Sequence, residues 1–553
     1  MMRKLIFTGI LSILLISNMF AQSADTVYVP ATNSDGSPYY NSLIDYVVAD
    51  TNAAGQQLHS VYKLERGQYY LLDQAISVRN PIKLVADPPV ANDPDKAPPK
   101  IMSNINSDGN TSTGNLIITW ADITVKNIWL SGIDIGGAAH GWGECGAVLV
   151  NDSLVTVTLD GIWCDYNSWS AFGSEQPHTR WHINNFHARN EQNEGDQWTT
   201  FLFYLERSSV VDTFIVTNSS YFQSNSCFLF PPKVVKYLEV NHCTIVNTLK
   251  WPFHQTQWLT AKFTNNIFCN AGALSLTPAE AESQDPNGLM FGLINVDTLF
   301  ANTVHDTLPP SPYTIPEDQR VVEVKNNLWY YSPQIESYLA SHDSVMHPVW
   351  MNERTIAMFA NDAVWPGLVE ENTWNQDPQF NDFAGFSDAV DSLAWICNDI
   401  RAGSTHPWVW DADRATDPDF WRIKSQYPTA ENFRSYTGLK GTDGLPLGDL
   451  SYYGGIDAVE KEEALPTAFK LQQNYPNPFN PTTTIEFAVP EAGRFTLKVF
   501  NILGQEVATL ANGEMNAGFH KATFDASKLA SGLYIYRLTG TNVNLTKKMM
   551  LLK

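Results

Sequence analysis

The sequence predicts an all-β protein, in which short strands stack into a solenoid and a small antiparallel β-sandwich follows. Three observations lead to this fold class. An eight-residue unit with apolar side chains at fixed positions recurs between residues 123 and 329. Turn residues separate the copies, which is typical of β-coils and not of helix pairs. Residues 466–553 then change to short runs that alternate apolar and polar residues, as in a small sandwich.

Residues 1–22 are predicted to be a secretory signal peptide. Arg3 and Lys4 precede an apolar run, and small residues around Ala21 offer a cleavage site. No later segment is apolar over the length that a membrane-spanning helix needs. We therefore expect an exported chain with no integral membrane span after the signal is removed.

The repeat unit has apolar residues at its first, third and eighth positions. Its seven copies are ITVKNIWL (123–130), VTLDGIWC (157–164), WHINNFHA (181–188), FIVTNSSY (214–221), LEVNHCTI (238–245), AKFTNNIF (261–268) and VEVKNNLW (322–329). A weaker copy, ISVRN, ends at Asn80. A short strand that recurs every 20 to 30 residues or so is typical of a solenoid.

The fifth position of the unit is expected to be the corner of each coil. It is occupied by Asn127, Gly161, Asn185, Asn218, His242, Asn265 and Asn326. Asparagine tolerates the left-handed backbone of a sharp bend, and its amide can form hydrogen bonds with the next coil. We therefore predict a structural ladder of Asn127, Asn185, Asn218, Asn265 and Asn326.

This pattern resembles the right-handed, single-stranded parallel β-helix of the pectate-lyase-like superfamily. In that superfamily a helix caps the open end, and a strand of the form Y-x-L-x-x-G-x-Y begins the coils; Tyr62, Leu64, Gly67 and Tyr69 match it here. The resemblance implies a parallel β-helix with an N-terminal capping helix over residues 23–335. It is specific for the fold and not for an activity.

The region between the repeat and the tail lacks the eight-residue unit. Residues 336–457 are expected to form the C-terminal cap, an irregular extension folded along the solenoid, with helices near residues 337–343 and 386–400. Residues 458–465 are a charged linker.

The tail, residues 466–553, resembles the type IX secretion sorting domain. The resemblance rests on NPFNPTTT (477–484), Gly504-Gln505-Glu506-Val507, SGLY (531–534) and the terminal KKMMLLK (547–553). It implies a bacterium of the Bacteroidota or a neighbouring phylum, passage through the inner membrane, and recognition by the type IX secretion machinery. The protein would then be released or attached to the outer-membrane surface.

Charge is spread unevenly over the chain. Residues 466–553 carry a formal charge of +4, whereas residues 23–465 carry −29. A body this acidic lacks the basic surface that nucleic acid requires, so we expect no nucleic-acid partner. The six cysteines lie far apart and include no Cys-x-x-Cys pair, so we expect most of them to be small core residues and not a disulfide framework. We expect the protein to be a monomer.

The stretch HTRWHINNFHARNEQNEGDQW (178–198) is the richest in side chains that could perform chemistry. A uronate lyase needs the substrate carboxylate neutralised, by a cation such as Ca²⁺ or by hydrogen-bond donors, and a Lys, Arg or His as base. The predicted catalytic residues are Arg180, His182, Arg189, Asp196 and Lys250; the predicted substrate-binding residues are Asp160, Trp198, Lys233 and His254. No metal site is predicted, because the spacing of His178, His182 and His187 suits a helix and this segment is predicted to be a strand.

Besides a purely structural solenoid, two functions remain open from the sequence. The first is action on an extracellular polysaccharide, as a polysaccharide lyase on uronate-containing glycans or, with less support, as a glycoside hydrolase. The alternative is a non-catalytic surface protein that binds glycans or mediates adhesion. The missing acid–base pair on the outward positions of the repeat favours the alternative.

Overall fold

The computed structural model divides the chain into two units, residues 1–455 and residues 456–553. Each unit is described by itself. The residues that the structure describes are 25–88, 97–105, 113–134, 145–167, 169–189, 201–205, 208, 210–224, 227–230, 234–253, 257–284, 292–296, 315–380, 386–403, 433–453, 469–471, 474, 477, 479–489, 493–515, 518–540 and 543–552.

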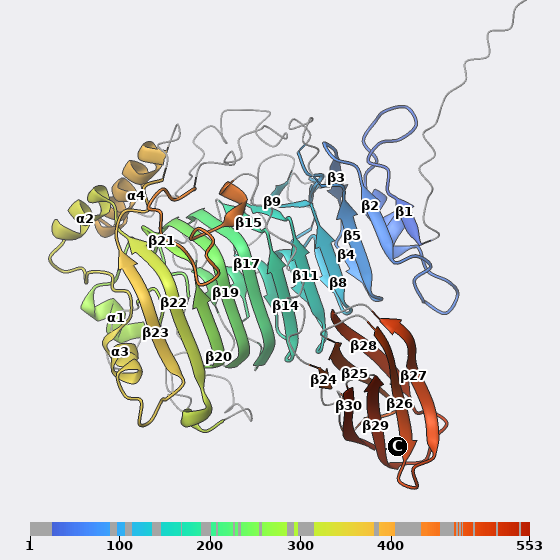
Figure 1. Cartoon of the computed structure of the whole chain (residues 1–553). Coiled ribbons are helices and arrows are strands. Elements are labelled where there is room, and N and C mark those ends of the chain that lie inside the picture. The colour runs from blue at the N-terminus through green and yellow to red at the C-terminus, as the bar shows by residue number, and fades with distance from the viewer. Residues whose placement is uncertain are drawn as a thin grey trace, which may run out of the picture. The chain divides into compact units, whose positions relative to one another are not determined.

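The first unit is a solenoid of parallel strands that form three sheet sections (Figure 1). The first sheet contains β1 (Thr26–Tyr28), β2 (Val61–Leu64), β5 (Ile82–Ala86), β8 (Ile123–Lys126), β11 (Thr156–Asp160), β14 (Thr179–Asn184), the first halves of β17 (Val210–Ser224) and β19 (Val234–Thr248), β20 (Gln257–Thr264), and the first halves of β22 (Val321–Tyr330) and β23 (Leu368–Asn375). The second sheet contains β3 (Tyr69–Leu72), β6 (Lys100–Ser103), β9 (Trp129–Asp134), β12 (Trp163–Asp165), β15 (His187–Arg189), β21 (Ile267–Cys269) and the second halves of β17, β19, β22 and β23. The third sheet contains β4 (Ile76–Val78), β7 (Ile117–Thr119), β10 (Cys145–Val150), β13 (Ser170–Ser174), β16 (Phe201–Tyr204) and β18 (Cys227–Phe230).

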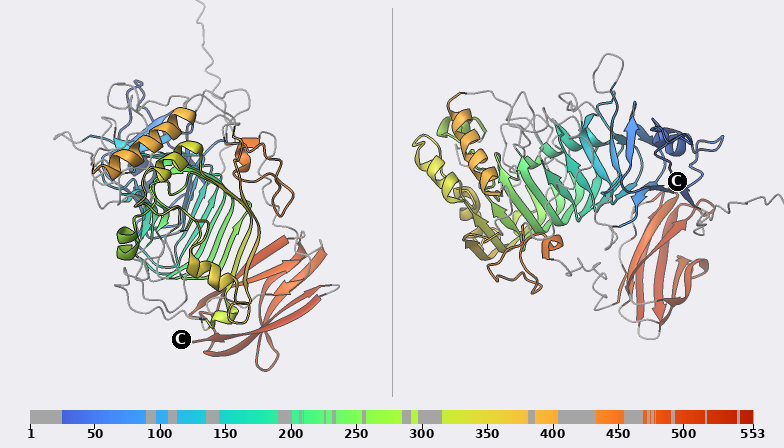
Figure 2. Two further views of the ribbon diagram at one scale, coloured as in Figure 1. Left: turned by 90° about the vertical axis from the view of Figure 1, so that its left-hand side faces the viewer. Right: turned by 90° about the horizontal axis from the view of Figure 1, so that it is seen from above.

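The pairing register of the first sheet is the register of the repeat. Phe263, at the third position of its copy, pairs with Val240 on one side and Val324 on the other. Every third-position residue, from Val125 to Val324, is almost fully buried. The predicted all-β class with parallel coils is therefore confirmed. Figure 2 shows successive coils one behind another.

Two copies of the unit were misjudged from the sequence. ISVRN is wrong as a member of the frame, because Ile76 pairs with Ile117 in the third sheet. The in-frame copy is β5, in which Ile82 pairs with Ile123. A further coil at β23 was missed, because its third position is Glu370 and not an apolar residue.

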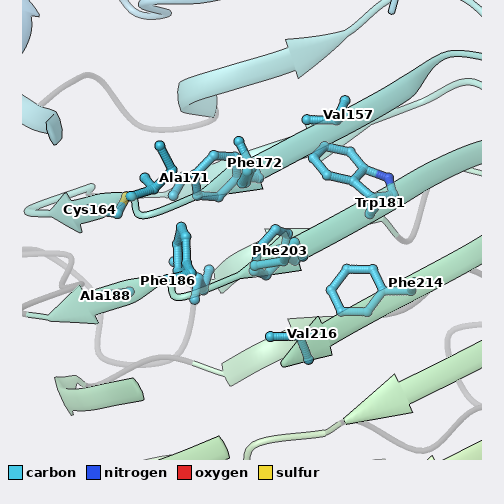
Figure 3. Packing of buried hydrophobic residues seen from close by; sticks show 14 of the residues in the cluster. Val157, Cys164, Ala171, Phe172, Trp181, Phe186, Ala188, Phe203, Phe214 and Val216 are labelled. Atoms are coloured by element: carbon cyan, nitrogen blue, oxygen red, sulfur yellow. The ribbon is translucent and has the colours of Figure 1, made fainter. Parts of the chain in front are cut away.

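The core of the solenoid is filled by the inward side chains of all three sheets. Trp181 and Phe214 of the first sheet meet Phe172 and Phe203 of the third sheet (Figure 3). The rings of Phe172 and Phe203 are stacked with their centroids 4.9 Å apart. Aromatic pairs of this kind add stability beyond the burial of their area.

The fifth position is a left-handed corner in the seven copies of the repeat and in β23. The φ angles there lie between 48° and 66° for the seven residues of the repeat and for Asn372 of β23. Several side chains at this position form hydrogen bonds with a neighbouring coil, as Asn265 Nδ2 does with Asn241 Oδ1 at 2.9 Å. A second ladder at the sixth position was missed: Asn266 Nδ2 donates to Asn327 Oδ1 at 2.9 Å, and Cys243 N donates to Asn266 Oδ1.

Helical segments lie at both ends of the solenoid (Figure 1). Near β4, a π-helical turn (Ile44–Val48) buries Val47 in the core. At the other end lie α1 (Pro278–Gln284), α2 (Pro333–Ala340), α3 (Glu353–Phe359) and α4 (Phe386–Arg401), together with a 3-10 turn (Glu317–Gln319). The helices predicted near residues 337–343 and 386–400 are confirmed as α2 and α4.

The second unit is a small antiparallel sandwich. One sheet contains β24 (Lys470–Leu471), β25 (Thr482–Val489) and β28 (Gly518–Asp525), and the other contains β26 (Gly493–Asn501), β27 (Glu506–Met515), β29 (Gly532–Gly540) and β30 (Val543–Leu551). Alternate residues of these strands, such as Leu497, Val499 and Tyr536, form its core. The predicted sandwich is confirmed for this part of the chain.

Candidate functional site

A charged cluster lies on the outer side of the second sheet. Most members occupy the seventh and ninth positions of successive coils, on either side of eighth-position core residues such as Cys164 and Ala188. Lys100 pairs with the seventh-position Trp129, and Asp134 lies three residues beyond Ser131. The cluster is Lys100, Trp129, Ser131, Asp134, Trp163, Asp165, His187 and Arg189. Side chains alternate across a strand, so the ones beside a core residue point away from the core.

Lys100, Asp165 and Arg189 are the charged centre of this cluster. The Lys100 ammonium lies 3.9 Å from the ring centroid of Trp129, and the side chain is 1% exposed. Ser131 Oγ donates to Asp165 Oδ1 at 2.7 Å, and Arg189 Nη2 lies 4.0 Å from Asp165 Oδ2. Among the described residues, Asp165 Oδ2 has no hydrogen-bond partner.

The pKa of the Lys100 ammonium lies close to neutral pH. Burial lowers the pKa of Lys100 and nearby Arg189 lowers it further, whereas Asp165 raises it; the result is a pKa of about 8. An amine with such a pKa is unprotonated in part of the population near pH 7 to 8, which is what a general base requires.

His187 connects this cluster to the C-terminal part of the solenoid. Its Nδ1 lies 2.7 Å from Ser220 Oγ and 3.4 Å from Asp449 Oδ2, and its ring centroid is 4.6 Å from that of Trp163. Burial lowers the pKa of His187, although Asp449 opposes it, and burial raises the pKa of Asp449. The pair therefore favours a neutral imidazole at neutral pH.

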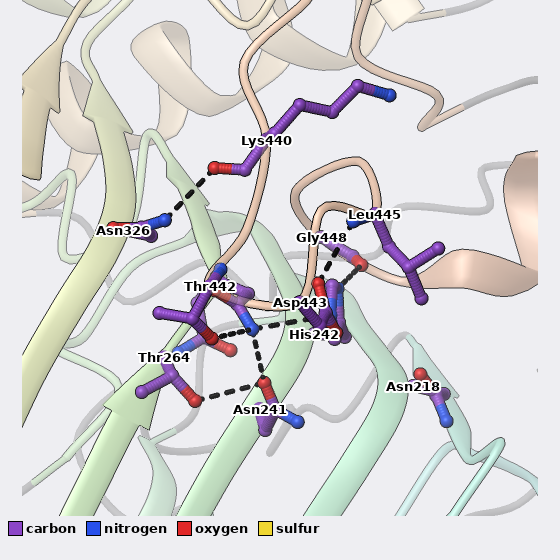
Figure 4. Close-up of polar contacts among 12 residues, drawn as sticks. Asn218, Asn241, His242, Thr264, Asn326, Lys440, Thr442, Asp443, Leu445 and Gly448 are labelled. Atoms are coloured by element: carbon purple, nitrogen blue, oxygen red, sulfur yellow. Dashed lines mark hydrogen bonds and ion pairs between the residues drawn. The ribbon is translucent and has the colours of Figure 1, made fainter. Parts of the chain in front are cut away.

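Asp449 belongs to a segment that crosses the corner of the coils, which we call the strap (residues 439–453). It ends in a 3-10 turn (Leu450–Tyr453). Asn326 Nδ2 donates to Lys440 O at 3.0 Å, and Thr442 N donates to Asn265 Oδ1 at 2.8 Å. Figure 4 shows these contacts from the strap to successive corner residues.

The middle of the strap is held by a histidine of the solenoid. His242 Nε2 lies 2.7 Å from Asp443 Oδ2, and His242 Nδ1 lies 3.3 Å from Gly448 O (Figure 4). Two neighbouring backbone amides of the strap complete the attachment: Gly448 N donates to Asn265 O, and Asp449 N donates to Thr244 Oγ1. The strap therefore positions Asp449 against the second sheet.

A second charged group lies on the outer side of the first sheet. Asp212 accepts from Lys236 at 2.8 Å and lies 2.9 Å from His178 Nδ1 and 3.8 Å from Arg180 Nη2. Burial raises the pKa of Asp212, but the hydrogen bonds from Lys236 and His178 outweigh this effect and hold the pKa below its usual value. One carboxylate thus gathers three basic side chains from neighbouring coils.

The structure places the predicted catalytic residues on different sheets. His182, exposed, and Arg180, half-buried, point outward from β14 in the first sheet, whereas Arg189 belongs to the second sheet. Lys250 is buried beside the third sheet, with its ammonium 5.2 Å from the ring centroid of Phe201. These four side chains therefore do not form one site.

The predicted substrate-binding residues are mostly outside the described part of the chain. Asp160 lies on the outer side of the first sheet, 2.7 Å from Lys126 Nζ, and accepts from Asn184. Trp198, Lys233 and His254 lie outside the described residues, as does Asp196, the fifth predicted catalytic residue.

Sequence reasoning missed Lys100, Asp165 and Asp449. Asp165 comes directly after the eighth position of its copy, as Arg189 does in the next coil. Extending the apolar–polar alternation by one residue would therefore have placed Asp165 beside Arg189. Lys100 lies on β6, outside the frame, and Asp449 is distant in sequence, so no local pattern could have indicated them.

The described residues offer neither a metal site nor a helix that could span a membrane. Among the residues that the structure describes, no group of three His, Cys, Asp or Glu side chains could hold a metal ion. In the same residues, every helix is too short or too polar to cross a membrane.

Comparison with known proteins identifies the C-terminal unit. Residues 473–552 match the family described as the secretion system C-terminal sorting domain. This match supports the predicted type IX sorting domain and export to the cell surface or to the outside. No curated protein and no solved structure matches the chain.

Proposed function

We propose that this exported protein acts on an extracellular polysaccharide at the charged cluster of the second sheet. The observation that carries the proposal is Lys100, with its pKa of about 8, beside Asp165 and Arg189. A base and a cationic partner near each other are what the β-elimination of a uronate glycan requires. Arg189 is 13% exposed and Trp163 is half-buried, so a sugar chain would meet these two side chains first.

Each side chain has a role in this proposal. Arg189 neutralises the carboxylate of the sugar, which makes the proton on the adjacent carbon more acidic. Neutral Lys100 takes that proton, the electron pair left on the carbon forms the double bond as the glycosidic C–O bond breaks, and the departing oxygen takes a proton from the Lys100 ammonium so formed or from water. Asp165 orients the Arg189 guanidinium and the Lys100 amine. Trp163 offers an aromatic face for a sugar ring. A bound cation such as Ca²⁺ would serve the same neutralising purpose as Arg189.

The test is product formation by the full chain. Polygalacturonate, alginate and chondroitin sulfate serve as substrates, with dextran as the neutral control, and both ultraviolet-absorbing unsaturated ends and reducing ends are measured. We expect unsaturated ends from one of the acidic polymers. Reducing ends without ultraviolet absorbance would indicate a hydrolase instead, and no product from any polymer would refute action on polysaccharide.

Variants connect the activity to the cluster. Lys100→Met retains the size of the side chain but removes the base, so we expect a loss of about a hundredfold or more. Arg189→Lys loses the planar fork that binds a carboxylate. Lys83→Met, at an exposed lysine of the first sheet, is the matched control and should retain full activity. Thermal unfolding of each variant reports whether the fold is intact.

A second candidate function is glycan binding without turnover, favoured by the outer side of the first sheet. Its polar side chains are fixed in columns that cross the coils: Thr264 Oγ1 donates to Asn241 Oδ1 at 2.9 Å, and Thr217 Oγ1 donates to Asn184 Oδ1. Such a fixed polar surface could bind a sugar chain at little entropic cost. Binding on a glycan array that persists in Lys100→Met, without product from any polymer, would support this candidate; no binding would reject it.

A further inference from the structure

Two apolar side chains project from the tip of the hairpin between β26 and β27, which we call the apolar knob (Ile502 and Leu503). Leu503 is 78% exposed and Ile502 is 69% exposed, which are the largest fractions for large apolar side chains among the described residues. Exposure of two adjacent aliphatic side chains at a turn has no benefit for folding, because polar residues form turns as well or better. Exposed apolar groups of this kind mark interaction sites.

The turn that carries the knob is held rigidly. Asn501 Oδ1 accepts from Leu503 N and from Gln505 N, both at 3.0 Å, and Asn501 Nδ2 donates to Gln505 Oε1 at 2.8 Å. Gly504 has φ of +77°, which lets the turn close. Below the turn, Lys498 Nζ lies 2.8 Å from Glu506 Oε2. A rigid turn loses little conformational entropy when it binds, which favours a specific contact.

The outer face of the same sheet is basic. Lys498 pairs with Arg537 across β26 and β29, and Ile535 pairs with Lys548 across β29 and β30, so these side chains share the face opposite the core. Arg494, four residues before Lys498 on β26, lies on the same face. We call these four cations the basic face. Among the described side chains, one acidic neighbour of this face is Glu506, which accepts a hydrogen bond from Lys498. The Arg537 guanidinium lies 5.3 Å from the ring centroid of Phe500, which leads into the knob.

We propose that the apolar knob and the basic face form one docking surface, and that its occupant is a folded protein of the secretion machinery. This partner would present an apolar pocket bordered by carboxylates. The charge of the chain supports this complementarity: the C-terminal region carries +4, whereas the rest of the exported chain carries −29. An acidic partner surface would attract this domain and repel the solenoid. The match to a sorting domain identifies the class of partner, because such a domain acts by being recognised.

The knob is tested by secretion of the full chain from a bacterium that has the type IX system. The measured quantity is the fraction of the chain at the surface and in the medium, relative to the fraction in the periplasm. We expect the double variant Ile502→Ser, Leu503→Ser to lower the exported fraction about tenfold, because central apolar anchors dominate such interfaces. Ile356→Ser, at a 55% exposed residue of α3, is the matched control and should be exported normally.

The basic face is tested by charge reversal. Arg537→Glu, Lys548→Glu should also lower export about tenfold, while Arg79→Glu, Lys83→Glu, the same change on exposed residues of the solenoid, should not. Thermal unfolding of the purified chains, with unchanged midpoints, establishes that the variants fold. Normal export of either sorting-domain variant, or an equal loss in its control, would overturn the proposal. A changed oligomeric state in size-exclusion chromatography with normal export would also overturn it, since the occupant would then be a second copy.

Discussion

A left-handed backbone at one corner residue explains why asparagine and glycine recur in this chain. At most residues that conformation brings the β-carbon close to the following carbonyl oxygen, whereas glycine avoids the contact and asparagine tolerates it best. The corner also connects neighbouring coils. Asn127 Nδ2 donates to Ala86 O at 3.0 Å, and Gly161 leaves the space that the Asn127 side chain occupies.

Gly161→Ala tests this corner. A β-carbon at residue 161 would lie 2.3 Å from Asn127 Oδ1, and the φ of +66° adds backbone strain. We expect the free energy of unfolding of the solenoid to fall by about 2 to 3 kcal/mol, measured by urea titration. Gly55→Ala is the control, because its φ of +75° is also left-handed but nothing lies within 4 Å of the added carbon. That variant should lose only about 1 kcal/mol. Equal losses in the two variants would mean that the packing between coils at Asn127 is unimportant.

At the scale of elements, the repeat predicted strands and register well, because a buried column must be filled in every coil. The seven copies align in the structure as they do in the sequence. What the frame could not predict lies outside it. The third sheet has short strands between loops of variable length, and β23 breaks the apolar column with Glu370.

The candidate site was only partly predictable for a related reason. Arg189 was identified because it lies in a His- and Arg-rich stretch, but its neighbours come from other coils. Asp165 lies a full coil earlier, Lys100 lies further toward the N-terminus, and Asp449 reaches the site through the strap. Stacking brings such residues together over long sequence separations, and a local pattern contains no information about that.

The strap is an element whose attachment depends on pH. Burial raises the pKa of Asp443, but the hydrogen bond with His242 lowers it more, so the pKa is below its usual value near 3.8. The ionised carboxylate therefore stabilises the docked strap. This stabilisation is fully present above about pH 3.8 and is lost as the pH falls through the lower pKa of the docked state.

Asp443→Asn should loosen the strap at neutral pH. Asp443 is 40% exposed, so water and salt weaken its ion pair, and we expect amide hydrogen exchange in residues 439–453 to rise only a few-fold. Exchange in β17 and β19 should stay unchanged. Asp343→Asn, at an exposed residue beyond α2, is the control and should leave the strap protected. Unchanged exchange in the Asp443 variant would show that the backbone bonds alone hold the strap.

At the scale of the whole molecule, the chain consists of two units with separate cores. The solenoid core and the sandwich core share no residue in the described part of the chain. Separate cores of this kind unfold as separate cooperative units. This independence suits a protein whose C-terminal unit directs export.

Calorimetry of the full chain should therefore resolve two transitions. Leu497→Ala removes a fully buried side chain of the sandwich, and Leu238→Ala removes one of the solenoid. Each change should destabilise its own unit by about 2 to 5 kcal/mol and leave the other midpoint unchanged. A single transition that shifts in both variants would contradict the division into two units.

The acidic residue in the last coil also limits how far the stack can grow. A parallel sheet that ends in an unpaired strand is a template to which a strand of another molecule could add. In β23 the inward column that carries Val324 one coil earlier carries Glu370, which accepts from Trp350 Nε1 at 2.8 Å. A second molecule added there would have to bury that carboxylate without gaining an aliphatic partner. The terminal coil therefore disfavours end-to-end assembly of the exported protein into fibres.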